Sequence, residues 1–221
     1  MAKLAWDAIG ERYYETGTKK GVLYVQSGNA YPKGVAWNGL TGFSIEPDGG
    51  DAEEIYADDI KYLSIRATED FGGTITAYTY PDEFMECDGS ATLIPGVYIS
   101  QQNRKPFGFS CVTTMGNDTE YNDHGYKIHL VYGCTAAPSS RDYQTINDSP
   151  EAIEFSWDID TVPAPVTGHK PTAHMEIDST KFKETADAAK LKALEDVLYG
   201  TEETEPRLPL PDEVLSILQG T

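Results

Sequence analysis

Strict alternation of side chains in two runs near the middle of the chain limits the fold to one built on β-strands. Lys61–Thr68 (KYLSIRAT) and Thr74–Tyr80 (TITAYTY) both repeat with a period of two. This period is typical of a half-buried strand, whose side chains point to opposite faces of a sheet in turn. Because only Glu69–Gly73 (EDFGG) separates the two runs, we predict a β-hairpin with a short glycine-rich turn over Ile60–Tyr80.

Other runs rich in β-branched and aromatic residues predict more strands before residue 180. Turn-forming residues separate these runs, and the chain has 20 Gly and 13 Pro. Such spacing favours many short strands joined by turns. Pro81–Cys87 begins with Pro followed by acids and predicts one or two helical turns. The expected strands are Gly21–Gln26, Val35–Pro47, Gly96–Gln102, Pro106–Met115, Tyr126–Thr135, Ala152–Asp160 and Ala173–Asp178.

The C-terminal segment has helical rather than strand periodicity. Thr185–Gly200 places apolar residues on one helical face, with Gly200 where a helix commonly stops. Either Thr185 or Ser179–Thr180 is the candidate N-cap. Pro209–Gln219 predicts a short second helix with Pro211 at its first position. We therefore expect one mainly β (α+β) domain: an N-terminal arm (1–17), a β-rich core (18–180) with a long acidic loop (46–59), and a helical segment (181–221) packed on that core.

The charge and cysteine content narrow the class of protein. The formal net charge is −19, from 17 basic and 36 acidic residues, which argues against a protein that grips nucleic acid phosphates. It permits a passage along which DNA slides without sticking. The odd set Cys87, Cys111 and Cys134 contains no CxxC pair, so we expect a reducing compartment. No secretory signal or membrane span is recognisable, and we expect a soluble protein made in the cytoplasm.

The sequence contains no recognisable catalytic, cofactor or metal motif, and we do not expect an enzyme. An EF-hand starting at Asp48 would lack side-chain ligands at Gly50 and Ala52. Asp70–Gly72 (DFG) stands without the other kinase motifs and predicts a turn. The four histidines lack zinc-site spacing, and His129 on its predicted strand is interpreted as structural. A hydrolase using two carboxylates has no motif in its favour.

The acidic stretch Glu46–Asp59 is the strongest candidate for a functional segment. Long loops are uncommon in compact domains and are often functional. Ile55 and Tyr56 are apolar residues in an acidic context, so we predict that this stretch docks on a neighbouring subunit, with its acids facing partner Lys or Arg. A solvated loop is the alternative. The predicted subunit-interface residues are Asp48, Asp51, Glu53, Glu54, Ile55, Tyr56, Asp58 and Asp59.

Several segments in order resemble the major tail protein, or tail tube protein, of phages with long non-contractile tails. The resemblance rests on Glu46–Gly89, with the acidic stretch, two alternating strands and YPDEF, and continues over nearly the whole chain. It is closest to versions from phages and prophages of Gram-positive hosts. The later matching stretches are PFGFSCVTTMGNDTE, YKIHLVYGC, PTAHMEIDS, LKALEDVLYGTEE and PLPDEV.

The resemblance implies a β-sandwich or barrel-like core with a flanking C-terminal helix and long inter-subunit loops. It also implies hexameric rings that stack into a hollow virion tail tube, through which DNA is ejected without specific binding. The implied partners are further copies of the chain, the tape measure protein, the tail-tip initiator and the tail terminator. Met1–Gly17 and Glu46–Asp59 become candidate bridges between rings, and Ile60–Tyr80 a candidate lumen lining. The alternative is an extracellular β-sandwich binding module, such as an adhesin or carbohydrate-binding domain.

Overall fold

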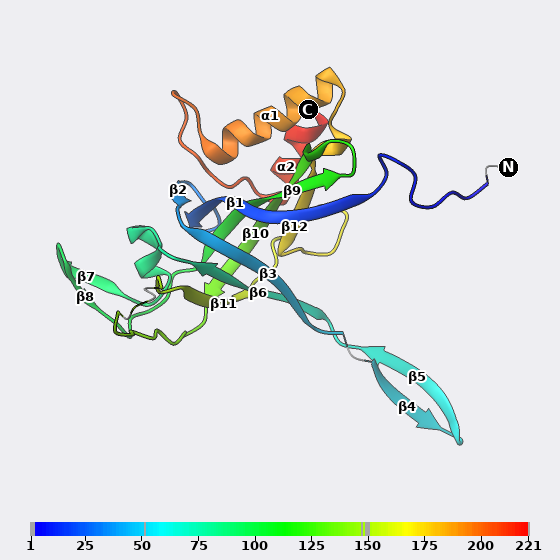
Figure 1. Cartoon of the computed structure of the whole chain (residues 1–221). Helices are drawn as coiled ribbons and strands as arrows, with labels where there is room; N and C mark the ends of the chain where they lie inside the picture. Colours follow the sequence, from blue (N-terminus) through cyan, green and yellow to red (C-terminus); the bar gives the residue numbers. More distant parts are fainter. Residues whose placement is uncertain (1–2, 51, 147, 149–150, 221) are drawn as a thin grey trace.

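The chain forms a long antiparallel sheet that bends back on itself, with helices packed on one of its faces (Figure 1). The structure is a computed structural model that describes residues 3–50, 52–146, 148 and 151–220. Its strands dominate and its α-helices lie at the C-terminal end, which confirms the expected mainly β, α+β class with a β-sandwich-like core. The strand order is β2-β1-β9-β10-β11-β6-β3, and β12 also pairs with β10.

The elements in chain order have the following bounds. The first half contains β1 (Tyr13–Val25), β2 (Gly34–Trp37), β3 (Leu40–Gly49), β4 (Ala52–Ala57), β5 (Ile60–Arg66), β6 (Glu69–Ala77), η1 (Asp82–Glu86), β7 (Ala91–Ile94) and β8 (Val97–Ile99). The second half contains β9 (Phe107–Asn117), β10 (Tyr121–Ala136), β11 (Phe155–Thr161), β12 (His174–Asp178), η2 (Ser179–Lys181), α1 (Thr185–Tyr199) and α2 (Pro211–Gln219).

Strand β10 is the strand at which the sheet bends. Its segment Lys127–Val131 pairs with β12, whereas Cys134–Ala136 pairs with β11. Gly133 lies between the two segments with φ +62°, and a Cβ added there would come within 2.2 Å of the Val162 carbonyl oxygen. Both the backbone angle and the close approach require glycine. The bend lets β11, β6 and β3 fold under β1, β9 and β10.

Two apolar clusters fill the spaces between the resulting layers. One cluster lies between the helices and the β1–β9–β10–β12 face, and includes Val112, Ile128, Leu130, Leu194 and Leu198. The other lies between that sheet and β6 with β11, and includes Phe84, Phe107, Phe109, Trp157 and Ile159. The molecule therefore has a helix layer and two β layers, with the outer face of β11, β6 and β3 left open to solvent.

The helical predictions are close to the structure. Helix α1 buries Leu191, Leu194 and Leu198, and Gly200 follows it with φ +78°. Pro211 begins α2, as expected. The N-cap prediction is wrong, because Glu184 occupies that position of α1 without a side-chain hydrogen bond.

The predicted hairpin over Ile60–Tyr80 is wrong in its pairing. Strand β5 pairs with β4 across a turn at Asp58 and Asp59, and β6 pairs with β3. Both aspartates have left-handed backbone angles, as in a type I′ turn. Gly73 lies inside β6 rather than in a turn. Glycine is needed at this position because a Cβ there would come within 2.2 Å of the Ser44 carbonyl oxygen on β3. Alternation identified the strands, but not their partners.

The prediction of a loop over residues 46–59 is also wrong. Glu46–Gly49 ends β3 and Ala52–Ala57 is β4, so much of the acidic stretch is strand. Strand β1 begins at Tyr13, inside the segment expected as an N-terminal arm. The backbone in these places pairs with neighbouring strands, which charge and hydropathy alone did not indicate.

Candidate assembly surfaces

The ribbon formed by β4 and β5, called the arm (Ala52–Arg66), projects away from the rest of the molecule (Figure 1). All of its strand residues are exposed. An isolated two-stranded sheet is at best marginally stable in water, and clustered exposed apolar side chains indicate an interaction surface. Six large apolar side chains of the arm are between 38% and 69% exposed: Ile55, Tyr56, Ile60, Tyr62, Leu63 and Ile65.

The two faces of the arm differ in character. Ile55 lies opposite Leu63, and Glu53 lies opposite Ile65, so these four side chains share one face. The other face carries Glu54, which accepts a hydrogen bond of 2.7 Å from the Tyr56 hydroxyl and forms an ion pair with Lys61. The hydrogen bond from Lys61, then that from Tyr56, lowers the pKa of the Glu54 carboxyl.

The predicted interface residues thus fall in three places. Asp48 ends β3, where its Oδ1 accepts a hydrogen bond of 2.7 Å from the Gly49 amide. Glu53, Glu54, Ile55 and Tyr56 lie in β4, and Asp58 and Asp59 form the turn at the tip. Asp51 lies outside the described residues. The arm brings together all of these residues except Asp48, which lies at its root, and Asp51.

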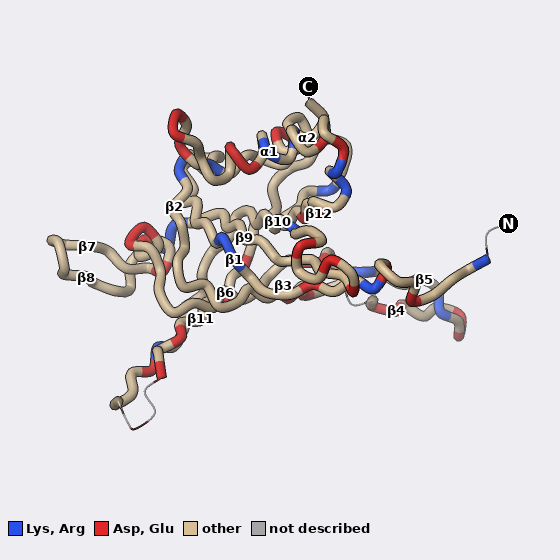
Figure 2. Tube along the Cα trace, turned by 45° about the horizontal axis from the view of Figure 1, so that its top comes forward, with Lys and Arg blue, Asp and Glu red and all other residues tan. Residues whose placement is uncertain are grey.

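The hairpin of β7 and β8 is a second projecting element, of which the sequence predicted only the second strand. It lies at the opposite end of the molecule from the arm (Figure 1). Residues 90–100 (SATLIPGVYIS) contain no charged side chain, and Figure 2 shows the hairpin without Lys, Arg, Asp or Glu. Pro95–Gly96 between two apolar runs is the signal that would have predicted it. Its exposed apolar residues are Leu93, Ile94, Val97, Tyr98 and Ile99.

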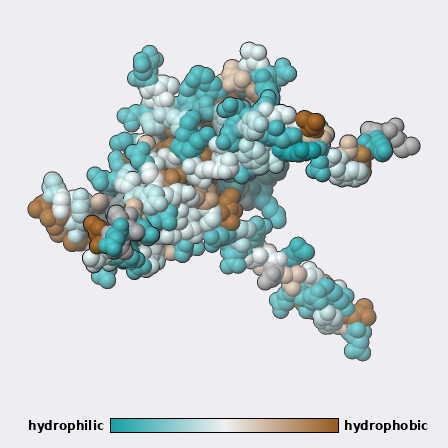
Figure 3. Space-filling model, in the orientation of Figure 1, coloured by the Kyte–Doolittle hydropathy of each residue, from teal (hydrophilic) through white to brown (hydrophobic). Residues whose placement is uncertain are grey.

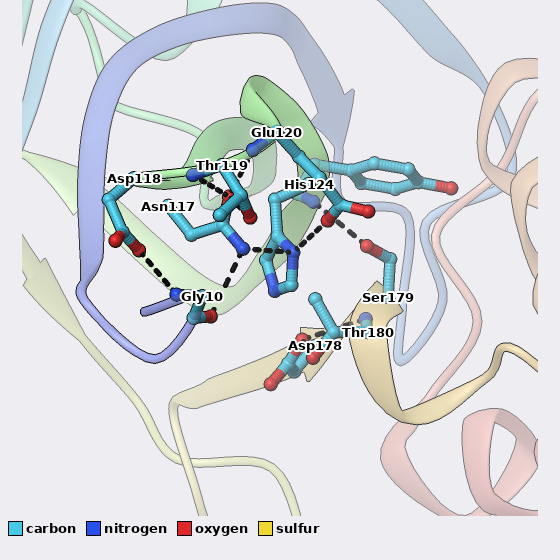
Figure 4. A network of polar contacts seen from close by, with 10 residues as sticks. Gly10, Asn117, Asp118, Thr119, Glu120, His124, Asp178, Ser179 and Thr180 are labelled. Carbon is cyan, nitrogen blue, oxygen red and sulfur yellow. Dashed lines mark hydrogen bonds and ion pairs between the residues drawn. The ribbon is translucent and has the colours of Figure 1, made fainter. Parts of the chain in front are cut away.

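A third element, the N-terminal segment, is held at its base by the turn between β9 and β10 (Figure 4). The Gly10 amide donates to Asp118 Oδ1 at 3.0 Å, and Asn117 Nδ2 donates to the Gly10 carbonyl oxygen at 3.2 Å. Asn117 is itself buried, and its Oδ1 accepts from the backbone of Thr119 and Glu120. We call this arrangement the Gly10 clasp. Beyond it, Leu4, Trp6 and Ile9 are exposed.

The open face of β11, β6 and β3 is acidic and rich in hydroxyl groups. Ser44, Thr74 and Asp158 form one cross-strand row, and Thr74 Oγ1 donates to Asp158 Oδ1 at 2.9 Å. Glu46 and Asp160 lie one step along on the same face. None of the three strands contains Lys or Arg. The face therefore presents negative charge without a cation from its own strands.

The described residues include Cys and His side chains of the kinds that metal sites and nucleophiles use. Among them, no group of three or more His, Cys, Asp or Glu side chains is arranged to hold a metal ion. The three cysteines are free and buried, and burial raises the pKa of the Cys111 thiol to about 12. His129 is buried and lies 3.0 Å from Thr113 Oγ1, in accordance with the structural interpretation. No helix in the described part of the chain has the length and hydropathy needed to cross a bilayer.

Comparison with known proteins gives no assignment: no protein-family model matches the chain, and no curated protein sequence matches it. The geometry of the projecting elements and of the open sheet face is therefore the basis for the functional conclusion.

Proposed function

We propose that this chain is the tail tube protein of a phage with a long non-contractile tail. In this proposal, six copies form a ring, rings stack into a hollow tube, and DNA passes through the tube into the host during ejection. The tape measure protein, the tail-tip initiator and the tail terminator would be the other partners. The protein would be made in the cytoplasm of a host bacterium, and would act in the virion.

The observation that carries the proposal is the arm, which presents six large apolar side chains on a ribbon that contacts little of its own chain. Exposing such a surface is costly for a permanent monomer, since it invites aggregation. A second copy that covers Ile55, Leu63 and Ile65 would remove this cost. The arm projects at one end of the molecule and the β7–β8 hairpin at the other, so the contacts would be heterologous (Figure 1). Heterologous contacts produce closed rings or open filaments.

The open sheet face supports the conduit part of the proposal. Ser44, Thr74 and Asp158, with Glu46 and Asp160, would line the lumen, and their strands carry no cation. Protein cations bind DNA by releasing its counterions, so an acidic wall avoids that retention. Strand β3 is at the end of the sheet order, and its outer edge would pair with the neighbouring copy in a ring. Part of the predicted lumen hairpin, Glu69–Ala77, would contribute to this wall; Ile60–Arg66 belongs to the arm.

Sedimentation velocity over a range of protein concentrations tests the proposal. The expected result is a species near six times the 24.3 kDa chain mass, together with larger polymers, at high concentration. A stable monomer that binds immobilised glycans would instead favour the binding-module alternative. A stable monomer without glycan binding would also contradict the proposal.

A further inference from the structure

The β7–β8 hairpin and the N-terminal segment are exposed apolar surfaces at opposite ends of the molecule. Figures 1 and 2 both show the hairpin at one end and the N-terminus at the other. Figure 3 shows hydrophobic surface at the hairpin end. Tyr98 on the hairpin is 50% exposed, and Trp6 in the N-terminal segment is 76% exposed. Neither element can reach the other within one chain, because the body of the molecule separates them.

The hairpin lacks the charged side chains by which many proteins protect sheet edges. Within the described residues, β7 and β8 pair only with each other, so each has an unpaired outer edge. Charged side chains, Lys above all, normally prevent such edges from pairing with other chains. Residues 89–103 contain no charged side chain at all, in a chain that is 24% charged. The hairpin is therefore suited to accept an extended, uncharged peptide as a third strand.

The N-terminal segment fits this description better than the arm does. Leu4, Ala5 and Trp6 form an uncharged apolar run, and the described segment before Asp7 has no helix or strand of its own. The tip of the arm would instead bring Asp58 and Asp59 against a surface that offers no cation. Burying carboxylates without a partner is strongly unfavourable.

The Gly10 clasp determines where the segment is presented. Asn117, the last residue of β9, and Asp118, in the turn that follows, bind both backbone polar groups of Gly10 (Figure 4). Gly10 has φ +88°, a conformation that favours glycine. Glu11 donates its amide to the Ala8 carbonyl oxygen at 3.0 Å, which closes a turn directly before β1. The clasp thus fixes the base of the segment at the end of the molecule away from the hairpin.

We propose that the N-terminal segment of one copy, with Leu4 and Trp6, docks as an added strand on the β7–β8 hairpin of a second copy. This inference rests on the proposed function, because it names the contact between successive copies in the polymer. Leu4 and Trp6 lie two residues apart and share one face of the added strand, where they pack on the hairpin face that carries Tyr98. The contact repeats head to tail. It buries apolar surface on both sides without burying a charge.

Cysteine cross-linking between two single variants tests this contact. The Trp6→Cys protein is mixed with the Tyr98→Cys protein under conditions of assembly and then oxidised. The native cysteines are buried and stay unreactive. The matched control replaces Tyr98→Cys by Val162→Cys, because Val162 is 70% exposed and lies outside the hairpin. We expect a disulfide-linked dimer, reversible by dithiothreitol, with at least a tenfold higher yield in the first mixture than in the control.

The result separates this contact from the proposed function. Equal yields in the two mixtures, or no dimer while rings or tubes form, overturn the contact and leave tube formation intact. No dimer and no assembled species of any kind would overturn both. A second variant, Ile94→Lys, adds a charge to the hairpin away from the core. It should keep the melting temperature of the monomer and lower the assembled fraction at least tenfold; normal assembly would overturn the contact.

Tryptophan fluorescence gives an independent readout on the native protein. Trp37 and Trp157 are buried, so Trp6 is the exposed tryptophan of the three. Acrylamide should quench Trp6 in unassembled protein, and docking on the hairpin should protect it. If acrylamide quenches Trp6 fluorescence as strongly in tubes as in the monomer, the contact is wrong.

Discussion

The imidazole rings of His129 and His174 stack in parallel, with centroids 5.4 Å apart and planes 9° apart. Nδ1 of His129 lies 3.2 Å from Nε2 of His174, a hydrogen bond that requires a lone pair on one of the two nitrogens. On its other side His174 stacks on Phe71 of β6, with centroids 5.1 Å apart. This column of rings connects β10 and β12 to the root of the arm.

The histidine pair predicts that acid destabilises the fold. Burial lowers the pKa of His129, and burial together with the nearby His129 lowers the pKa of His174 to about 4. The unfolded chain therefore takes up more protons than the folded chain as the pH falls from about 7 to 4, and the free energy of unfolding decreases over that range. Allowing for solvent around the half-buried His174, we expect a loss on the order of 2 kcal/mol.

The other charged groups around the pair affect the same measurement. Glu15, Lys127 and Glu176 face it from β1, β10 and β12. Burial opposes ionisation of Glu15, but hydrogen bonds from Lys127 and Thr113 leave the pKa of its carboxyl lowered, so its stabilising effect is lost only below about pH 4.5. Urea unfolding at pH 7, 5.5 and 4.5 checks the prediction. His174→Phe should flatten the dependence, and constant stability from pH 7 to 4.5 would contradict it.

The packing of α1 predicts a large effect from one core substitution. Leu194 is fully buried between the helix and the sheet. Leu194→Ala should decrease the free energy of unfolding by about 3 kcal/mol, because it removes buried methyl groups and leaves a cavity. Lys192→Ala is the matched control on the exposed side of the helix and should change stability by less than about 0.5 kcal/mol. Similar effects of the two substitutions in urea unfolding would show that α1 does not pack on the sheet in this way.

Because the arm lies outside the core, we predict that substitutions in it impair assembly without destabilising the monomer. Replacing both Ile55→Ser and Tyr56→Ser should keep the melting temperature of the monomer, because both side chains are exposed and outside the core. The assembled fraction, measured by sedimentation, should fall at least tenfold. Val162→Ser removes an apolar side chain elsewhere that is more exposed than Ile55 or Tyr56, and this variant should assemble normally. Normal tubes from the double variant would exclude docking through these two residues.

The net charge of −19 predicts that salt promotes assembly. Like charges on separate copies repel over roughly a Debye length, about 8 Å at physiological ionic strength. Raising sodium chloride from 50 mM to 1 M should therefore lower the protein concentration at which light scattering detects polymer. Sucrose of matched osmolality serves as the control for solvent exclusion. A protein that remains monomeric at every salt concentration would contradict this prediction.

The sequence was sufficient for the type of most elements but not for their pairing. Apolar periodicity identified α1, and turn residues separated β9 from β10, because both signals are local. Strand β5 pairs with β4 because Asp58 and Asp59 adopt the left-handed backbone of a tight turn. The glycines Gly72 and Gly73 wrongly suggested a turn on the other side of β5. Only the second strand of the β7–β8 hairpin was predicted, although Pro95–Gly96 between two apolar runs is a local turn signal.

The interface residues also divide into those that local sequence indicated and those that depend on contacts in space. Ile55 and Tyr56 were recognised from their acidic context, and the structure describes them on the arm. Leu63 and Ile65 were placed on a half-buried strand without a role in the interface, because alternation does not distinguish a face packed on a core from one that another chain covers. The Gly10 clasp joins residues more than 100 positions apart in the chain, and no local pattern contains that information.

The most direct measurement is negative-stain electron microscopy of the purified protein at increasing concentration, at low and high salt. Our account predicts rings and then hollow tubes of uniform diameter with a stain-filled axial channel. Uniform single particles the size of one 24.3 kDa chain under all of these conditions would contradict it.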